Sequence, residues 1–242
     1  MRIDEYEKMY KVQNTHWWFI GKANIVEDVI DKTDRQTILD IGCGAGLMLR
    51  RLLKYGEVYG VDFSAEAVKF SSRILTNGSV KQGALPDGIP FSDGEFDLIT
   101  MLDVLEHVDD DAASVKTLYR LLKPRGLAIV TVPAYMHLWS NHDRVLEHKR
   151  RYTKQHLLSL FDKREWQIEK ATYFNSLLYL PILFIRTLNK LFHPHRVETD
   201  DALPSAPMNA VFTAVMRLER KYLRRNNFPV GVSVLISARK LT

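Results

Sequence analysis

The feature that most constrains the fold is a β-rich apolar run, residues 37–41, that breaks into three alternating glycines and leads directly into a helical segment, 47–53. The glycines are Gly42, Gly44 and Gly46. Glycine adopts backbone angles that a side chain forbids and lets a ligand lie against bare main chain, and a helix start presents unpaired N–H groups. The run therefore predicts a strand, a tight turn and a helix start that hold a polar or charged ligand.

The alternation of short apolar runs with helical periodicity continues to about residue 132. Strands are expected at 37–41, 58–63, 79–82, 96–101 and 127–132, and helices at 47–54, 65–75 and 111–122. This order is typical of βαβ units in a parallel sheet. Pro124 and Gly126 predict a turn between the last of these helices and its strand.

The pattern changes beyond residue 133. A helix at 154–161 and a strand at 166–174 precede a closing β-rich run, 230–238, which can form a hairpin with that strand. We therefore expect an α/β fold, a Rossmann-like doubly wound sheet of about seven strands with an antiparallel last strand and a helical insertion before it. The expected division is an N-terminal helical lid over 1–34, a sheet domain over 35–174 and 228–242, and the insertion over 175–227.

Composition limits the class of protein. The chain has 242 residues, of which 46% are hydrophobic, and this is enough for one full core. A single cysteine, Cys43, rules out an internal disulfide, and the first eleven residues hold no apolar signal core, so we expect a cytoplasmic protein. The net charge of +5 is concentrated in two basic clusters, 144–154 and 217–225, each of which is explained as well by a solvated face.

An acidic residue closes the second expected strand. Asp62 lies 22 residues after Asp40, and a carboxylate there can accept hydrogen bonds from both hydroxyls of a ribose. Asp62 could instead cap the next helix, although Ser64 is better placed for that. A dinucleotide dehydrogenase is the rival class, but its fingerprint separates the second and third glycines by two residues and this chain by one. Asp40 would also repel a pyrophosphate and attract a cationic amino group.

Four motifs in this order, residues 39–46, 61–64, 96–99 and 121–126, resemble those of class I S-adenosylmethionine-dependent methyltransferases. The similar group is the methyltransferase type 11/23 and ubiquinone-biosynthesis O-methyltransferase-like group. The resemblance implies S-adenosylmethionine as the cofactor and S-adenosylhomocysteine as its product. It also implies that the glycine loop lies under the methionine part, that Asp62 holds the ribose and that the next residue lines the adenine.

The resemblance carries these roles onto a larger set of residues. The expected cofactor-binding residues are Asp40, Gly42, Cys43, Gly44, Gly46, Asp62, Phe63, Ala84, Leu85, Met101 and Trp18. Many relatives have an aspartate where this chain has Ala84, so the adenine contact would pass to the backbone of Ala84 and Leu85 or to Asp87. Trp18 belongs to an aromatic run, 16–19, that either closes over the cofactor as a lid or covers the sheet edge as core.

The segment 101–108 resembles the Leu-Glu-His-Val segment of the ubiquinone-biosynthesis enzymes and supplies a first candidate base, His107. A histidine titrates near neutral pH and can take a proton from a hydroxyl nucleophile. Glu106 and His107 can equally hydrogen-bond within the turn and orient the loop. One Glu-His pair without clear ligand spacing predicts no metal site.

The loop over 133–152 follows a strand end, where open α/β sheets bind their ligands. His142 and His148 are further candidate bases, and Arg150, Arg151 and Tyr152 are expected to contact substrate. Arginine and histidine suit a phosphate or carboxylate. The alternative is a salt-bridged loop that packs on the domain.

The insertion holds the most apolar run of the chain, 177–185. Nine residues are too few to span a bilayer, which needs roughly 20. Together with the apolar pattern at 208–216 and the basic residues after it, the run predicts two helices with one apolar face and a basic margin. This suits membrane contact, a lipid-like substrate tunnel or a dimer interface, and equally an insertion packed on its own domain.

These features predict an S-adenosylmethionine-dependent methyltransferase acting on a small-molecule or lipid- or sugar-linked acceptor, with O-methylation favoured. The expected partners are that substrate, a membrane surface contacted through 175–227 and a second copy of the chain, and nucleic acid is not expected. An RNA or protein methyltransferase and a non-catalytic S-adenosylmethionine-binding partner protein are the alternatives.

Overall fold

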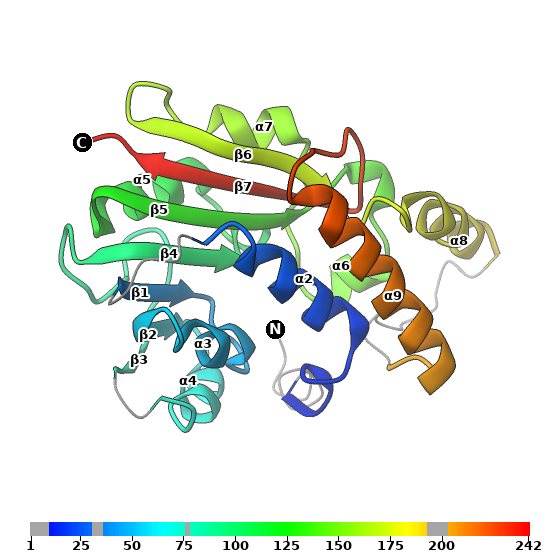
Figure 1. Ribbon diagram of the computed structural model, residues 1–242, viewed down its shortest axis with the longest axis horizontal. Coiled ribbons are helices and arrows are strands. Elements are labelled where there is room, and N and C mark those ends of the chain that lie inside the picture. The colour runs from blue at the N-terminus through cyan, green and yellow to red at the C-terminus, as the bar shows by residue number, and fades with distance from the viewer. Residues whose placement is uncertain (1–9, 31–35, 76–77, 193–202) are drawn as a thin grey trace.

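The centre of the molecule is a seven-stranded mixed sheet with the strand order β3-β2-β1-β4-β5-β7-β6. The computed structural model describes residues 10–30, 36–75, 78–192 and 203–242. The strands are β1 (Gln36–Ile41), β2 (Gly56–Asp62), β3 (Val80–Gln82), β4 (Phe96–Leu102), β5 (Leu122–Pro133), β6 (Trp166–Phe174) and β7 (Ser233–Lys240). Helices cover both faces of this sheet (Figure 1).

The helices follow the expected order. They are α2 (Trp17–Glu27), α3 (Leu47–Leu52), α4 (Ala65–Ser71), α5 (Asp111–Leu121), α6 (Asn141–Val145), α7 (Lys154–Ser159), α8 (Tyr179–Phe192) and α9 (Ala206–Leu223), with two short 3-10 turns, η1 (Leu105–His107) and η2 (Met136–Leu138). Side-chain caps begin several of them. Ser64 caps α4, Asp110 caps α5 and Thr153 caps α7, each accepting a hydrogen bond from a backbone N–H of the first turn.

The direction of the strands confirms the expected Rossmann-like sheet. β1 pairs in parallel with β2 and β4, and β5 continues the parallel set beside β4. β7 runs antiparallel to both β5 and β6, so the last two strands form the predicted hairpin. Each strand of the centre is apolar on both sides because each face carries its own core: Ile38 and Leu98 belong to one cluster, and Leu39 and Ile99 to the other.

One predicted turn lies inside a strand. Pro124 and Gly126 were expected between the helix and its strand, but β5 already begins at Leu122. The pairing with β4 shifts register here and resumes at Leu127, so the irregular stretch accommodates a proline that cannot donate to the ladder. The prediction of a turn was wrong because the local Pro-Gly signal is the same for a turn and for a bulge.

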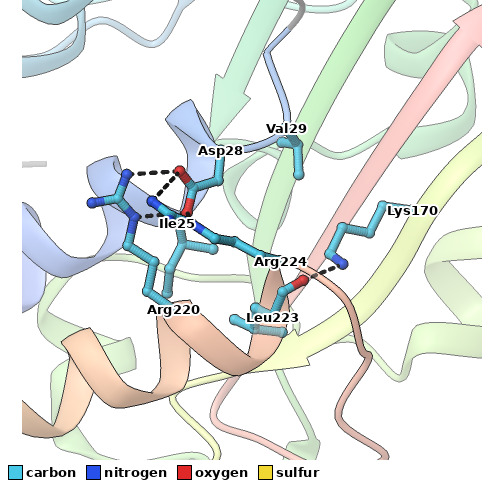
Figure 2. A pocket seen from close by; sticks show the side chains of 7 residues that line it. All are labelled: Ile25, Asp28, Val29, Lys170, Arg220, Leu223 and Arg224. Atoms are coloured by element: carbon cyan, nitrogen blue, oxygen red, sulfur yellow. Dashed lines mark hydrogen bonds and ion pairs between the residues drawn. The ribbon is translucent and has the colours of Figure 1, made fainter.

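The N-terminal helix and the insertion pack together on one face of the sheet. α2 and α9 lie side by side, and Arg220 and Arg224 of α9 both bind Asp28 at the end of α2. Figure 2 shows these groups around a pocket of about 70 Å³, in which Lys170 donates to the Leu223 carbonyl. No expected cofactor residue lines this pocket. Within the described ranges, no helix combines the length and apolar character needed to cross a bilayer.

The division into lid, sheet domain and insertion stays a prediction. α2 lies in the expected lid, and α8 and α9 lie in the expected insertion between β6 and β7. Parts of the lid (1–9 and 31–34) and of the insertion (193–202) fall outside the described residues.

Candidate cofactor and active site

The glycine loop joins the end of β1 to the start of α3, as the sequence predicted. Gly42, Gly44 and Gly46 all have positive φ angles, +72°, +51° and +80°. A Cβ on Gly42 would lie 2.2 Å from a methyl of Val104, and the Gly42 N–H donates to the carbonyl of Val61 at 2.7 Å. The turn therefore needs glycine for both its conformation and its close packing.

Asp62 braces this loop at the end of β2. One carboxylate oxygen accepts the Gly44 N–H at 2.8 Å and the other accepts the Ser64 N–H at 3.0 Å. Ser64, not Asp62, caps the following helix. The next residue, Phe63, is 58% exposed although it is a large aromatic residue. The Asp62 carboxylate at the loop suits a ribose, and the exposed Phe63 ring beside it suits an adenine. Both roles stay predictions.

Asp40 is the second buried acid of the loop. It accepts a hydrogen bond of 2.6 Å from the hydroxyl of Thr100 on β4. Burial raises the pKa of Asp40 to about 7, because the charged carboxylate loses its hydration. A cationic ligand group at this position would restore the charged form.

The other expected cofactor residues lie in tighter packing. The backbone of Ala84 pairs with Gly88 in both directions, at 3.2 and 2.8 Å, so a local turn already uses its N–H and carbonyl. Met101 and Cys43 are buried, and burial also raises the pKa of the Cys43 thiol. Leu85 packs against the core, and Trp18 stacks on Phe174 with ring centroids 5.6 Å apart. These contacts favour a structural role over cofactor contact for each of these side chains.

A cluster of charged groups gathers after the end of β4. Asp103 accepts hydrogen bonds from the Lys22 ammonium of α2 at 2.6 Å and from the Thr131 hydroxyl at 2.9 Å. Burial alone would raise the pKa of Asp103, but the Lys22 ammonium outweighs it and holds the pKa below its ordinary value. Glu106 is fully buried, and this burial raises its pKa well above the usual range. Lys22 was not predicted as part of this cluster, because its partner lies 81 positions away and a helical lysine carries no signal of such a contact.

The candidate bases form a histidine group at this same place. The rings of His107 and His148 have centroids 4.8 Å apart, and those of His142 and His148 lie 6.2 Å apart. The Nδ1 of His148 lies 2.8 Å from a carboxylate oxygen of Asp143, which fixes the orientation of the ring. Burial lowers the pKa of His107 to about 4. His107 is therefore neutral at pH 7 and is a weak base.

Two of these histidines, together with Glu106, form a set of possible metal ligands. Glu106, His107 and His148 each offer a ligand atom, and these atoms lie within 4.8 Å of one another. One carboxylate and two imidazoles are ligands that Zn²⁺ accepts. No spacing in the sequence reveals this grouping, since His148 comes from a different loop. That no metal binds here stays a prediction.

The expected substrate residues make internal contacts. Arg151, with a side chain only 2% exposed, forms two hydrogen bonds to Asp143, and Arg150 binds Asp111. The Tyr152 hydroxyl also donates to Asp111, at 3.0 Å. These contacts match the interpretation of a salt-bridged loop more closely than that of a substrate wall, and sequence spacing could not show which carboxylates the arginines find.

Comparison with known proteins finds similarity over the part of the chain that holds the glycine loop. Residues 39–130 match the family model described as a methyltransferase domain. The chain is 32% identical over 130 residues to the ubiquinone biosynthesis O-methyltransferase of Idiomarina loihiensis, covering 50% of each chain. It is 31% identical over 101 residues to that of Psychrobacter cryohalolentis, covering 39% of each. The chain thus spans half or less of the length of these two relatives.

Solved structures show the same fold at low identity. An S-adenosylmethionine-dependent methyltransferase of Mesorhizobium loti superposes with a TM-score of 0.61 at 17% identity, covering 94% of this chain and 99% of that one. A similar enzyme of Thermotoga maritima gives 0.62 at 19%, covering 98% and 96%. A [4+2]-cyclase gives 0.60 at 18%, covering 90% and 79%, so the fold by itself does not fix the reaction.

The sheet order and the glycine loop are those expected of a class I S-adenosylmethionine-dependent methyltransferase, and residues 39–130 match the methyltransferase domain model. The ubiquinone-biosynthesis enzymes are similar to part of this chain, and this similarity does not identify the methyl acceptor of this chain.

Proposed function

We propose that the chain transfers the methyl group of S-adenosylmethionine to an oxygen of a small-molecule or lipid- or sugar-linked acceptor. The observation that carries the proposal is the glycine loop braced by Asp62, with the buried Asp40 beside it. Asp40 is suited to the cationic amino group of the cofactor, and Asp62 to its ribose. When bound, the cofactor supplies an electrophilic methyl group.

The residues after β4 would then handle the proton of the acceptor. His148 is the best-oriented base, since Asp143 holds its Nδ1 and directs its Nε2 toward the buried carboxyl of Glu106, 4.0 Å away. An acceptor hydroxyl placed against His148 would give up its proton to Nε2 as its oxygen bonds to carbon. Most of the rate would come from positioning the oxygen in line with the methyl group.

The role of His148 can be tested by its replacement. We expect His148→Gln to lower kcat about 100-fold, while cofactor affinity changes little, because general-base catalysis contributes on that scale. His156→Gln, a change to a histidine on α7, is the matched control and should leave kcat unchanged. Unchanged turnover in His148→Gln would move the role to His107 or His142 or remove the need for a base.

The function itself is tested by labelling. Purified protein is incubated with methyl-labelled S-adenosylmethionine and an extract of its own source cells, and label is counted in organic, aqueous, nucleic-acid and protein fractions. Label in the organic or small-molecule fraction supports the proposal. Label confined to RNA or protein would replace it with the macromolecular alternative, and cofactor binding without any transfer would indicate a non-catalytic partner protein.

A further inference from the structure

Helix α8 is attached to the molecule by its polar side. The Arg186 guanidinium donates to the Leu138 carbonyl at 2.6 Å, and the Lys190 ammonium donates to the His137 carbonyl at 3.1 Å. Two turns before Arg186, the Tyr179 hydroxyl lies 2.9 Å from the Nε2 of His137. These positions share one face of the helix, and that face rests on the turn after β5.

The opposite side of α8 is apolar and exposed. Leu180, Phe184, Leu188 and Leu191 follow at helical spacing, and the first, second and fourth are 71%, 63% and 69% exposed. Phe192 beside them is 71% exposed, and α8 has no buried residue. A helix of a globular protein normally buries its apolar face, whereas the described residues leave this face largely uncovered, which is typical of a face that binds a separate partner.

The charge around this face favours an anionic partner. Residues 175–192 and 203–227 contain one carboxylate, Glu219, and it is buried against the backbone N–H groups of Ser176 and Leu177. The same residues carry the exposed cations Arg217, Lys221, Arg224 and Arg225. Over the whole insertion, 175–227, the sequence has eight Lys and Arg against four Asp and Glu, so its net charge is positive, and a negatively charged lipid surface complements it better than a second copy does.

We infer that α8 docks on the surface of an anionic lipid bilayer, with Leu180, Phe184, Leu188 and Leu191 in the acyl boundary and the basic residues of α9 near the headgroups. The helix lies in the membrane plane and does not span it, because it has 14 residues. Figure 1 shows α8 projecting from the body of the molecule, where it is accessible to such a surface. The turn that anchors α8 follows β5, so a bilayer there would lie near the end of the sheet that binds ligands. That last consequence rests on the proposed function.

Vesicle binding tests the inference without cofactor or acceptor. The full chain is sedimented with phosphatidylglycerol–phosphatidylcholine vesicles and with pure phosphatidylcholine vesicles. We expect binding to the anionic vesicles, weakening with added salt, and little binding to the neutral ones. Leu180→Ser with Leu191→Ser should reduce the partition coefficient about tenfold or more, because both changes remove apolar contact from a face that the fold does not bury.

Matched variants separate membrane binding from general effects. Leu53→Ser changes an exposed leucine at the end of α3, and Lys116→Glu with Lys163→Glu changes the net charge as much as Arg217→Glu with Lys221→Glu does. Only the changes in α8 and α9 should weaken binding. Absence of vesicle binding, or equal binding by the serine variant, would overturn the inference. A concentration-dependent dimer that this variant abolishes would assign the face to a second copy instead. Neither outcome bears on methyl transfer.

Discussion

At the scale of single residues, the account depends on two carboxylates that differ in their surroundings. Asp62 accepts hydrogen bonds from two backbone N–H groups. Asp40 accepts one hydrogen bond from a hydroxyl, and its burial raises its pKa to about 7. Both were selected from the sequence, because Asp40 lies near the end of β1 before the glycine loop and Asp62 ends β2, and their cofactor roles stay predictions. What the sequence could not supply is their protonation, which depends on burial and on Thr100 from another strand.

The pKa of Asp40 predicts how cofactor binding varies with pH. The cofactor's ammonium group binds the ionised carboxylate, and the ionised fraction falls from about one half at pH 7 to about one tenth at pH 6. Affinity should therefore fall about fivefold over this interval, measured by calorimetric titration. Asp40→Asn should bind more weakly and lose the dependence. A wild-type affinity independent of pH would place the ammonium group elsewhere.

Asp62→Asn tests the brace and the ribose contact together. The amide keeps the shape of the side chain but loses the charge and one acceptor, so we expect cofactor affinity to fall about 10- to 100-fold. Asp93→Asn, a change of the same kind at an exposed residue, is the control. Equal affinities in Asp62→Asn and wild type would remove Asp62 from the cofactor site.

At the scale of elements, the loop after β5 is held by the buried pair of Arg151 and Asp143. Asp143 accepts two hydrogen bonds from Arg151 and also contacts His148, so the pair positions the candidate base as well as the loop. Replacing Arg151 by Met leaves the buried carboxylate without its partner. We expect the free energy of unfolding to fall by about 3 kcal/mol in a denaturant titration.

The exposed pair of Arg164 and Asp162 supplies the control for this change. Arg164→Met should leave the free energy of unfolding nearly unchanged, because the pair is solvated. Burial alone would raise the pKa of Asp143, but His148 and Arg151 outweigh it and hold that pKa well below its ordinary value. The stabilisation is therefore complete above the ordinary pKa of an aspartate and is lost as the pH falls toward the lowered value. Equal losses of stability in the two arginine variants would show that the buried pair stabilises the fold no more than the exposed pair does.

The elements also show where sequence analysis succeeds and fails. The strands of the centre were predictable because apolar runs of their length, bounded by turn residues, have few alternatives. The turn at Pro124 was not, since the bulge depends on pairing with β4. Arg150 and Tyr152 contact Asp111 at the start of α5, and Arg151 contacts Asp143 in α6. No local sequence pattern predicts these pairings.

At the scale of the whole molecule, a Rossmann-like sheet carries a helix at its N-terminal side and two helices between its last strands. α2 connects these parts: Lys22 reaches Asp103 after β4, and Asp28 binds Arg220 of α9 and Arg224 at its C-terminal end. The glycine loop and Asp62 could be placed from the sequence because their motifs are local, and their cofactor roles stay predictions. The grouping of the candidate bases could not, because it is assembled from the turn after β4 and the loop after β5.

The most direct measurement is a calorimetric titration of the purified chain with S-adenosylmethionine at pH 7, with S-adenosylhomocysteine and NAD as comparison ligands. The account predicts saturable one-site binding of both methionine-derived ligands and no binding of NAD, since Asp40 repels a pyrophosphate. Absence of binding by S-adenosylmethionine, or preferential binding of NAD, would contradict the central claim.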